Sequence, residues 1–381
     1  HIDQLDFLVK SLIHIYLFIL NTLSVLIFFK PLSNLDLSKI PKLKKLLFLF
    51  TFFINKIDQI FFVIVSMHHY GEEEITALDI GDLTLSDKEC HFKFIVLGSG
   101  PSGAVTALEL EKKYPGEVLL IERGLHNSIP NTKHPGEEFI QKWYRGGINS
   151  TYSLDMIAYS SGACFGGGSE INSGLYHEPD EEFLQKWGDE YGTKNLSKES
   201  LEPFVKKVEA LTTKQTSEKT LFSSKFEEGA RHSSNEYSYL PRFLNEDGHR
   251  NSMSETLLKE YIQRNGKVKL EYEIHKIYYK DKKWFLKSKD RKTLYSCESL
   301  FICCGSVFTN NLLLKSRIIN KNKKYLKRFK FHPMIKVIAS YDEELQEIND
   351  DIVADQNTEF YPKFIIGNAS SSLQFLISSF Q

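Results

Sequence analysis

Residues 92–122 contain the pattern that most limits how this chain can fold. Phe92–Leu97 (FKFIVL) is a short, mostly apolar run, which is typical of a parallel strand buried on both faces. It leads directly into a glycine-rich turn, GSGPSG, and then into AVTALELEKKY, whose apolar spacing predicts a helix. After a Pro-Gly break, Val118–Ile121 predicts a second strand, and Glu122 stands at its end. This order predicts an α/β fold that begins with a dinucleotide-binding unit.

The residues of this turn have physical reasons to be there. Gly98 permits the tight turn, Gly100 lets the main chain approach a pyrophosphate, and Gly103 allows the helix to pack closely on the strand. The helix N-terminus offers free N–H groups and the positive end of the helix dipole to the phosphates. Glu122 can accept hydrogen bonds from an adenosine ribose. The alternative is an accidental glycine turn. The predicted contacts of the dinucleotide are Gly98, Ser99, Gly100, Pro101, Ser102, Gly103, Glu122 and Arg123.

A second glycine-rich stretch, Ser161–Tyr176 (SGACFGGGSEINSGLY), contains three successive glycines followed by Ser and Asn, and it predicts no regular element. Such a loop serves where main-chain N–H groups lie against a flat or anionic ligand. The alternative is a flexible linker, which would have polar residues around its glycines. Ile171, Leu175 and Tyr176 alternate with small residues instead, and this favours an ordered loop.

Together the two motifs resemble those of the glucose-methanol-choline (GMC) oxidoreductases, FAD enzymes that oxidise alcohols and include cholesterol-oxidase-like members. The resemblance runs from about Phe92 to Ser340, and it includes a later strand and glycine turn at 300–306. It implies that the first motif is the FAD fingerprint and that the second lines the pyrophosphate and the flavin ring. Ile274 is the counterpart of a strand residue that touches adenine, although a core position explains it equally well. The further residues implied to bind FAD are Gly167, Gly168, Ser169, Asn172, Ser173, Gly174, Leu175, Ile274 and Gly305.

The resemblance also implies a domain organisation. We expect a three-layer, Rossmann-like FAD-binding domain made of residues 91–190 and 250–330. Residues 191–249 and 331–381 would form part of an antiparallel-sheet substrate or cap domain.

Hydrophobic periodicity predicts the remaining elements. Residues 212–249 are polar and Ser-rich and predict an irregular cap, while the adjacent Cys303 and Cys304 are interpreted as small apolar residues of a buried strand. The predicted helices are residues 180–211, with Pro203 near the start of the last helix, and residues 253–264. The predicted strands are residues 267–280 and 282–289, around an Asp281-Lys282 turn, and residues 335–340.

The sequence does not indicate which residue is catalytic. In the resembled family the base is a His, paired with a second His or an Asn, near the C-terminus. Tyr341–Gln381 contains no His, so we expect a C-terminally truncated member. The other histidines considered stand in turn-like or surface-like segments, which favours structural or solvent-facing roles: His126, His134, His177, His249, His275 and His332.

Composition excludes several classes of protein. Lys and Arg together number 48 and Asp and Glu 49, so there is no basic field to attract nucleic acid. The 5 Cys have no CxxC spacing, which argues against a structural zinc site and for reduced thiols in a cytoplasmic compartment. The expected ligands are therefore FAD and a small-molecule alcohol, without a metal.

Residues 1–66 differ from the rest because they lack Gly, Ala, Arg, Glu and Cys, and the first Met is Met67. Ser11–Phe29 has no charged side chain and would be about 28 Å long as a helix, enough to cross a bilayer core. Lysines follow it, which would keep that side in the cytoplasm. One interpretation is a membrane anchor at residues 11–29. The others are a translated upstream sequence, with the protein starting at Met67, or a soluble helical extension.

The predicted function is oxidation of the CH–OH group of an alcohol by hydride transfer to flavin N5. We expect this chain to contain only part of such an enzyme. One alternative is a catalytically inactive flavin-binding fragment. Another is a membrane-anchored protein with a vestigial nucleotide fold. A flavoprotein that uses NAD(P)H would require a second GxGxxG motif, and residues 104–381 contain none.

Overall fold

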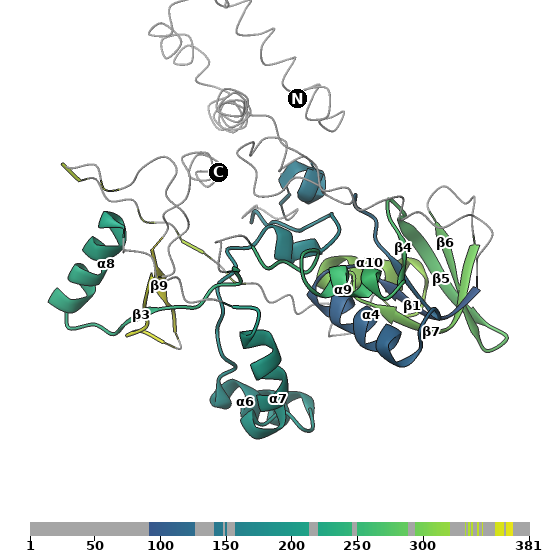
Figure 1. Cartoon of the computed structure of the whole chain (residues 1–381), viewed down its shortest axis with the longest axis horizontal. Helices are drawn as coiled ribbons and strands as arrows, with labels where there is room; N and C mark the ends of the chain where they lie inside the picture. Colours follow the sequence, from purple (N-terminus) through teal and green to yellow (C-terminus); the bar gives the residue numbers. More distant parts are fainter. Residues whose placement is uncertain are drawn as a thin grey trace, which may run out of the picture. The chain divides into compact units, whose positions relative to one another are not determined.

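The computed structural model describes much of the chain after residue 90, and the chain divides into two compact units. Residues 1–76, 132–160 and 373–381 form the first unit, and residues 77–131 and 161–372 form the second. The described residues are 91–125, 141–147, 149–150, 157–212, 220–245, 250–288, 294–320, 332, 334–335, 337, 341–342, 345, 355–361 and 363–368 (Figure 1).

The apolar N-terminal segment, including the possible anchor at 11–29, lies outside the described residues. Among the helices that the structure does describe, none combines the length and apolar character needed to cross a bilayer.

The first unit is described only around a short 3₁₀ helix, η5 (Tyr144–Gly147). Asn149 Nδ2 donates a hydrogen bond to the carbonyl of Tyr144 at 2.8 Å, and Ser150 forms an antiparallel bridge with Ala158. None of the predicted cofactor-binding residues belongs to this unit.

The second unit is built on a six-stranded sheet with strand order β4-β2-β1-β7-β6-β5. Strands β4, β2, β1 and β7 are parallel, and β5, β6 and β7 form an antiparallel meander. The strands are β1 (His91–Leu97), β2 (Val118–Ile121), β4 (Lys267–Lys269), β5 (Ile274–Lys280), β6 (Lys283–Ser288) and β7 (Leu294–Ile302).

Strand β7 belongs to both parts of the sheet. Its first half pairs with β6, with Trp284 opposite Cys297, while its second half pairs with β1, with Leu97 opposite Ile302. The last strand of the meander therefore ends beside the strand that enters the glycine turn. The carboxyl ends of β1 and β7 lie at one edge of the sheet, where α/β proteins bind their ligands.

Two apolar clusters cover the two faces of the parallel strands. On one face, Val96 and Leu120 pack with helices α4 (Pro101–Lys113) and α9 (Leu257–Gln263). On the other face, Ile95 packs with residues of the meander and with helix α10 (Gly305–Lys315). Full burial of such a side chain contributes about 1.5–3 kcal/mol. These layers confirm the predicted three-layer α/β architecture.

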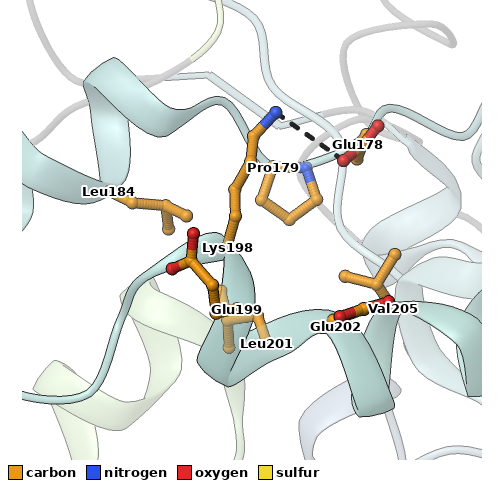
Figure 2. A pocket seen from close by; sticks show the side chains of 8 residues that line it. All are labelled: Glu178, Pro179, Leu184, Lys198, Glu199, Leu201, Glu202 and Val205. Atoms are coloured by element: carbon orange, nitrogen blue, oxygen red, sulfur yellow. Dashed lines mark ion pairs between the residues drawn. The ribbon is translucent and has the colours of Figure 1, made fainter.

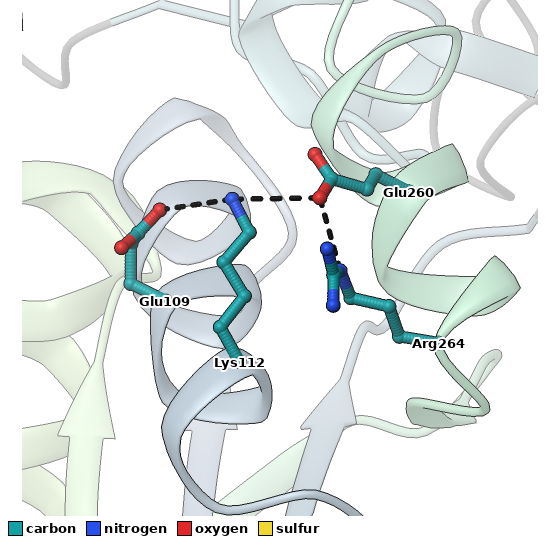
Figure 3. A network of polar contacts seen from close by, with 4 residues as sticks. All are labelled: Glu109, Lys112, Glu260 and Arg264. Carbon is teal, nitrogen blue, oxygen red and sulfur yellow. Dashed lines mark hydrogen bonds and ion pairs between the residues drawn. The ribbon is translucent and has the colours of Figure 1, made fainter.

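Helices α4 and α9 are also joined by a network of charged side chains (Figure 3). Lys112 Nζ lies 3.2 Å from Glu109 Oε1 and 3.4 Å from Glu260 Oε1, and Arg264 Nε lies 2.9 Å from the same oxygen of Glu260. These groups are well exposed, so each pair contributes about 0–1 kcal/mol.

The segment between β2 and β4 contains two consecutive capped helices. Helix α6 (Glu181–Tyr191) begins where Asp180 Oδ1 accepts a hydrogen bond from the N–H of Glu182 at 2.8 Å, and it ends at Gly192 in the left-handed region. Helix α7 (Lys198–Glu209) begins with a capping box formed by Ser197 and Ser200.

A small antiparallel sheet with strand order β3-β8-β9 lies in the same unit. Its strands are β3 (Tyr237–Tyr239), β8 (Asp355–Asn357) and β9 (Ile366–Gly367), and helix α8 (Leu221–His232) packs on it. Ser223 Oγ of α8 donates to the buried Asp355 Oδ2 at 2.6 Å. The predicted assignment of these residues to a separate substrate domain stays a prediction.

Several predicted elements are wrong in detail. Residues 212–249 are not an irregular cap throughout, because they contain α8 and β3. Pro203 lies inside α7, and the helix predicted at 253–264 begins at Leu257. In the predicted strand 335–340, neither Ile335 nor Val337 is in a strand, and the other residues lie outside the described part.

The predicted strand 267–280 is broken into β4 and β5 for a physical reason. The N–H groups of Glu271 and Tyr272 donate to the carbonyls of Gly124 (3.1 Å) and Glu122 (3.0 Å), so the chain leaves the sheet to follow the segment after β2. Glu271 turns with a left-handed φ of 52°. The Asp281-Lys282 turn is confirmed, with both residues at positive φ.

Candidate functional site

The first glycine turn is closed by main-chain contacts. The N–H of Gly98, which has a φ of 92°, donates to the carbonyl of Ile121 at 2.8 Å. A β-carbon on Gly98 would lie 2.5 Å from the carbonyl oxygen of Cys303, and one on Gly103 would lie 1.8 Å from that of Gly98. The tight turn and the close packing expected of these glycines are therefore present.

Two helices begin at this edge of the sheet without side-chain caps. Helix α4 follows Gly100, with Pro101 as its first residue, and α10 begins at Gly305. Neither helix has an acidic residue in its first turn. First-turn N–H groups have no intrahelical partner and carry the positive end of the helix dipole, so both helix starts favour an anionic ligand.

Glu122 is buried at the end of β2 and organises the turn. Its Oε2 accepts hydrogen bonds from the N–H of Ser99 (2.9 Å) and from Ser99 Oγ (2.8 Å), and its Oε1 accepts one from the N–H of Gly124 (2.9 Å). A carboxylate has about four acceptor positions, so one position, on Oε1, has no partner among the residues that the structure describes. That position is the one able to bind a ribose hydroxyl. The guanidinium of Arg123 lies over the ring of Phe308, 3.7 Å from its centroid.

The second glycine motif was predicted to have no regular element, but Gly167–Glu170 forms one turn of 3₁₀ helix, η6. Gly166 precedes it with a φ of 95°, and Ser169 Oγ donates to the carbonyl of Gly166 at 2.8 Å. Further along, the N–H of Gly174 donates to Asn172 Oδ1 at 3.0 Å. The loop is thus ordered by its own side chains, as an ordered ligand-binding loop requires.

The two glycine motifs lie against each other. The N–H of Gly166 donates to Ser99 Oγ at 3.0 Å, so one hydroxyl joins the first turn, Glu122 and the second loop. A β-carbon on Gly167 would lie 2.8 Å from the Cα of Gly100. The two motifs therefore lie at one place in the fold, and the prediction that they bind one FAD molecule stays a prediction.

Beside these close contacts the glycine main chains face open space. A β-carbon on Gly100 would meet one atom, the Cα of Gly167, at 4.0 Å, and one on Gly168 or Gly305 would meet nothing within 4 Å. These open positions belong to the same motifs as the two helix starts without side-chain caps and as Glu122, whose Oε1 has one acceptor position without a partner among the described residues. The residues present therefore fit a dinucleotide.

Ile274 is the first residue of β5 and packs against the core. It is connected to the site through Tyr272, whose N–H donates to the carbonyl of Glu122. The structure brings the first turn (Gly98, Ser99, Gly100, Pro101, Ser102, Gly103, Glu122 and Arg123) together with the start of the second loop at Gly166 and Gly167, next to Gly168 and Ser169, and with Cys303 shortly before Gly305. The described contacts of Asn172, Ser173, Gly174 and Leu175 are instead with residues of the segment 242–250 or within the loop itself. The cofactor contacts of all these residues, and of Ile274, stay predictions.

The two adjacent cysteines lie just after β7, in the turn before α10, and not in the strand as predicted. Burial raises the pKa of the Cys303 thiol, and burial together with the nearby Glu122 raises that of Cys304 to about 12. Both thiols therefore stay protonated at neutral pH, which agrees with a packing role. Among the described residues, no group of His, Cys, Asp and Glu side chains could hold a metal ion.

A pocket of about 310 Å³ lies between α6 and α7, beside the ion pair of Lys198 and Glu178 (3.7 Å) (Figure 2). None of the predicted cofactor-binding residues lines it. Of the histidines considered above, His177, His275 and His332 are exposed, and His126, His134 and His249 lie outside the described residues.

Sequence reasoning missed four residues that shape the site. A β-carbon on Gly124 would lie 2.1 Å from the carbonyl oxygen of Ala163, and one on Gly162 would lie 2.5 Å from the carbonyl carbon of Gly167. Both are thus needed for the packing of the second loop, and their sequence signal is only that Gly124 follows Glu122 by two residues and that Gly162 lies at the start of the second motif. Arg242 and Arg250 also contact this loop, and no local pattern announces them.

The fold and the paired glycine loops define a dinucleotide-binding protein. The chain belongs to the GMC oxidoreductase family, because the family model described as GMC oxidoreductase matches residues 140–334, just over half of the chain. The members of this family are FAD-binding flavoproteins.

Individual relatives match parts of this chain. An uncharacterised GMC-type oxidoreductase of Sinorhizobium fredii is 24% identical over 318 residues, which are 74% of this chain and 60% of the relative. Pyranose dehydrogenase 3 of Leucoagaricus meleagris is 32% identical over 128 residues, which are 32% of this chain and 21% of the relative. This chain thus spans less than two thirds of the length of these curated relatives.

Among solved structures, pyridoxine 4-oxidase from Mesorbium loti is similar with a TM-score of 0.47 and 16% identity, over 59% of this chain and 52% of that chain.

Proposed function

We propose that this chain provides the FAD-binding part of an oxidoreductase that acts on the CH–OH group of an alcohol. The observation that carries the proposal is the contact between the two glycine motifs, where Ser99 joins Glu122 to Gly166 and Gly167 lies against Gly100. Next to this contact, a β-carbon on Gly100 would meet one atom, at 4.0 Å, and one on Gly168 would meet none. FAD, when bound there, would supply the hydride acceptor, flavin N5, for oxidation of the alcohol.

The residues of the chain would have distinct tasks toward FAD. The first-turn N–H groups of Ser102 and Gly103 in α4 would bind the pyrophosphate. The vacant acceptor position on Glu122 Oε1 would bind a hydroxyl of the adenosine ribose. The second loop, Gly167–Leu175, would lie along the pyrophosphate and the flavin ring, and Gly168 in particular leaves room for a flat ligand.

The substrate class rests on family membership and on the names of relatives. The relatives include glucose oxidase 2 of Penicillium expansum, 28% identical over 133 residues (31% of this chain and 21% of the relative), and the pyranose dehydrogenase described above. We therefore propose polyhydroxylated donors, sugars first, as the compounds to test. The base that takes the hydroxyl proton is not assigned to any residue.

The test begins with the 381-residue chain as purified and after incubation with FAD. We expect the absorption bands of bound flavin and the release of FAD on denaturation. A folded chain that neither carries nor takes up FAD would contradict the proposal. A holoprotein that oxidises glucose, other pyranoses or simple primary alcohols with a dye as electron acceptor supports the full proposal. A holoprotein inert toward all of them refutes the part that concerns alcohol oxidation by this chain.

We also propose a cytoplasmic location. The described cysteines are Cys164, Cys297, Cys303 and Cys304, and none of them forms a disulfide bond with another described residue, as is usual in reducing compartments. Recovery of the protein from cells in the cytosolic fraction supports this proposal, and recovery from a secreted fraction contradicts it.

A further inference from the structure

One segment, Pro241–Ser254, binds the second glycine loop at both of its ends. The structure describes residues 241–245 and 250–254 of this segment, which face each other as a hairpin, with Asn251 N–H donating to the Phe243 carbonyl at 2.9 Å. On one side, the N–H of Phe243 donates to the carbonyl of Gly174 at 2.7 Å. On the same side, Arg242 Nε donates to the carbonyl of Ser173 at 3.3 Å.

The other side of the hairpin binds the start of the loop. The N–H of Met253 donates to Ser169 Oγ at 3.0 Å, and Ser254 Oγ donates to Glu170 Oε1 at 2.9 Å. Ser169 and Glu170 are both buried. The loop predicted to bind the cofactor is thus fixed by partners about 80 residues further along the chain, as the sequence separation of 84 for these bonds shows.

Arg250 contacts the main chain in the middle of the loop. Its Nη1 donates to the carbonyl oxygens of Ser169 (3.3 Å) and Asn172, and it lies 3.4 Å from Asn172 Oδ1. Asn172 Oδ1 also accepts the N–H of Gly174 at 3.0 Å. One guanidinium therefore holds two carbonyls that are three residues apart, together with the side chain that closes the next turn.

These contacts determine which way the peptide groups of the loop point. In a trans peptide, the carbonyl of one residue and the N–H of the next point in opposite directions. When Arg250 holds the carbonyls of Ser169 and Asn172, the N–H groups of Glu170 and Ser173 are turned away from Arg250. Ser173 is a predicted cofactor contact, and main-chain N–H groups are what such a loop offers to an anionic ligand.

We propose that Arg250 is a positioning residue for FAD, which holds the second glycine loop in the orientation that binds the cofactor. This inference rests on the proposed function, because it assumes that the loop binds FAD. All three contacts come from Nη1, whose two N–H groups are held in a fixed direction by the planar guanidinium, whereas a lysine ammonium is a compact point charge on a flexible stem. The role therefore requires arginine, and the positive charge alone does not satisfy it.

The test compares Arg250→Gln and Arg250→Lys with Arg264→Gln in the 381-residue chain. Arg264 is a matched control because it is exposed, caps the C-terminus of α9 and pairs with Glu260, and none of its described contacts joins it to either loop. FAD is titrated into each apoprotein, and the quenching of flavin fluorescence gives the Kd. We expect both Arg250 variants to raise the Kd about tenfold or more, and the control to keep the wild-type value.

A second measurement needs no cofactor and separates positioning from general stability. In hydrogen exchange of the apoproteins, Arg250→Gln should accelerate exchange in peptides covering 161–175 and leave those covering α4 unchanged. Faster exchange throughout α4 as well would show a merely structural role and overturn the proposal. If Arg250→Gln does not fold, Ser254→Ala removes the neighbouring bond to Glu170 and should raise the Kd about two- to fivefold.

The remaining outcomes are distinct. A wild-type chain that binds no FAD refutes the proposed function, and this inference with it. A wild-type chain that binds FAD, with an unchanged Kd for Arg250→Gln, refutes the inference alone. If Arg250→Gln raises the Kd but Arg250→Lys keeps the wild-type Kd, the effect comes from the positive charge alone. That result also overturns the proposal.

Discussion

Gly167 lies so close to Gly100 that a β-carbon on Gly167 would stand 2.8 Å from the Cα of Gly100. The two residues come from different glycine motifs, and Gly167 has a left-handed φ of 58°. Position 167 requires glycine for two reasons. A β-carbon there would come closer to the main chain of Gly100 than real β-carbons do, and any side chain is strained at this φ.

Gly167→Ala should therefore separate the two motifs. The left-handed conformation costs about 1–2 kcal/mol for alanine, and the contact with Gly100 adds to this cost. We expect a lower unfolding midpoint of the apoprotein and FAD binding about tenfold weaker, which denaturant unfolding and flavin titration measure. Gly168→Ala is the matched variant, because nothing lies within 4 Å of its β-carbon. This variant should unfold like the wild type, but it should bind FAD more weakly than the wild type does. An unchanged affinity for FAD would show that the cofactor does not occupy the space beside Gly168.

Ser99→Ala should destabilise the junction of the first turn with the second loop. The change removes a donor to Glu122 Oε2 and the acceptor of the Gly166 N–H, both buried. Loss of such bonds costs about 1–3 kcal/mol. Chemical denaturation should show this loss, and flavin content should fall with it. Ser224→Ala, which removes an exposed hydroxyl of α8, serves as the control and should change stability little. Equal stability of the two variants would disprove the role of Ser99.

Glu111 gives the stability of the fold a dependence on pH. The side chain is buried, its Oε1 accepts the Gly116 N–H at 2.7 Å, and within the described residues its Oε2 has no hydrogen-bond partner. Burial raises the pKa of this carboxyl above its usual 4.5, although the bond from Gly116 and the charges of Lys267 and Arg264 oppose the shift. A raised pKa means that the folded state binds more protons than the unfolded state. The stabilisation is therefore present below pH 4.5 and is lost as pH rises through the folded pKa.

Glu111→Gln should remove this dependence. Glutamine keeps an oxygen for the Gly116 N–H but carries no charge, so the variant should gain stability relative to the wild type as pH rises. Thermal unfolding between about pH 4 and pH 8 measures the difference in Tm, which should widen and then level off. A difference that stays constant or narrows with rising pH contradicts the assignment to Glu111.

Gly229→Ala should stabilise α8. Gly229 lies inside this helix, is exposed, and would have no atom within 4 Å of an added β-carbon. Glycine inside a helix costs about 0.5–1 kcal/mol relative to alanine, so this is the expected gain. Denaturant unfolding should show a higher midpoint with an unchanged slope. A lower midpoint would mean that the helix does not form there as described.

The elements that could be predicted from the sequence are those with strong local signals. β2 has the predicted bounds because its four apolar residues stand between a Pro-Gly break and an acid, and all four are buried. Helix α8 was missed because its sequence is rich in Ser, Glu and Lys and only Ser223 and Ala230 are buried. Its place depends on the bond from Ser223 to Asp355, which is 132 residues away.

The site, like the fold, could be predicted only where the sequence carries a strong local signal. The two glycine motifs could be identified because glycine is required wherever main chains approach closely, and such positions leave a visible pattern. The contacts of Arg250 with Asn172 leave none, because arginine occurs on any surface and a carbonyl acceptor has no sequence signature. The break at Glu271 was also invisible, since it depends on hydrogen bonds to the segment after β2.

The pairing of β1 with β7 has a consequence for synthesis of the chain. His91 in β1 and its neighbour Ser296 in β7 are separated by 205 residues, so β1 leaves the ribosome long before this partner exists. At about 5–20 residues per second, the delay is about 10–40 s. During that time β1 can pair with β2 along one edge only. The main-chain N–H and C=O groups of its other edge stay free to pair with wrong strands. Slow translation or a lack of chaperones should therefore harm this protein through aggregation of nascent chains, before any cofactor could bind.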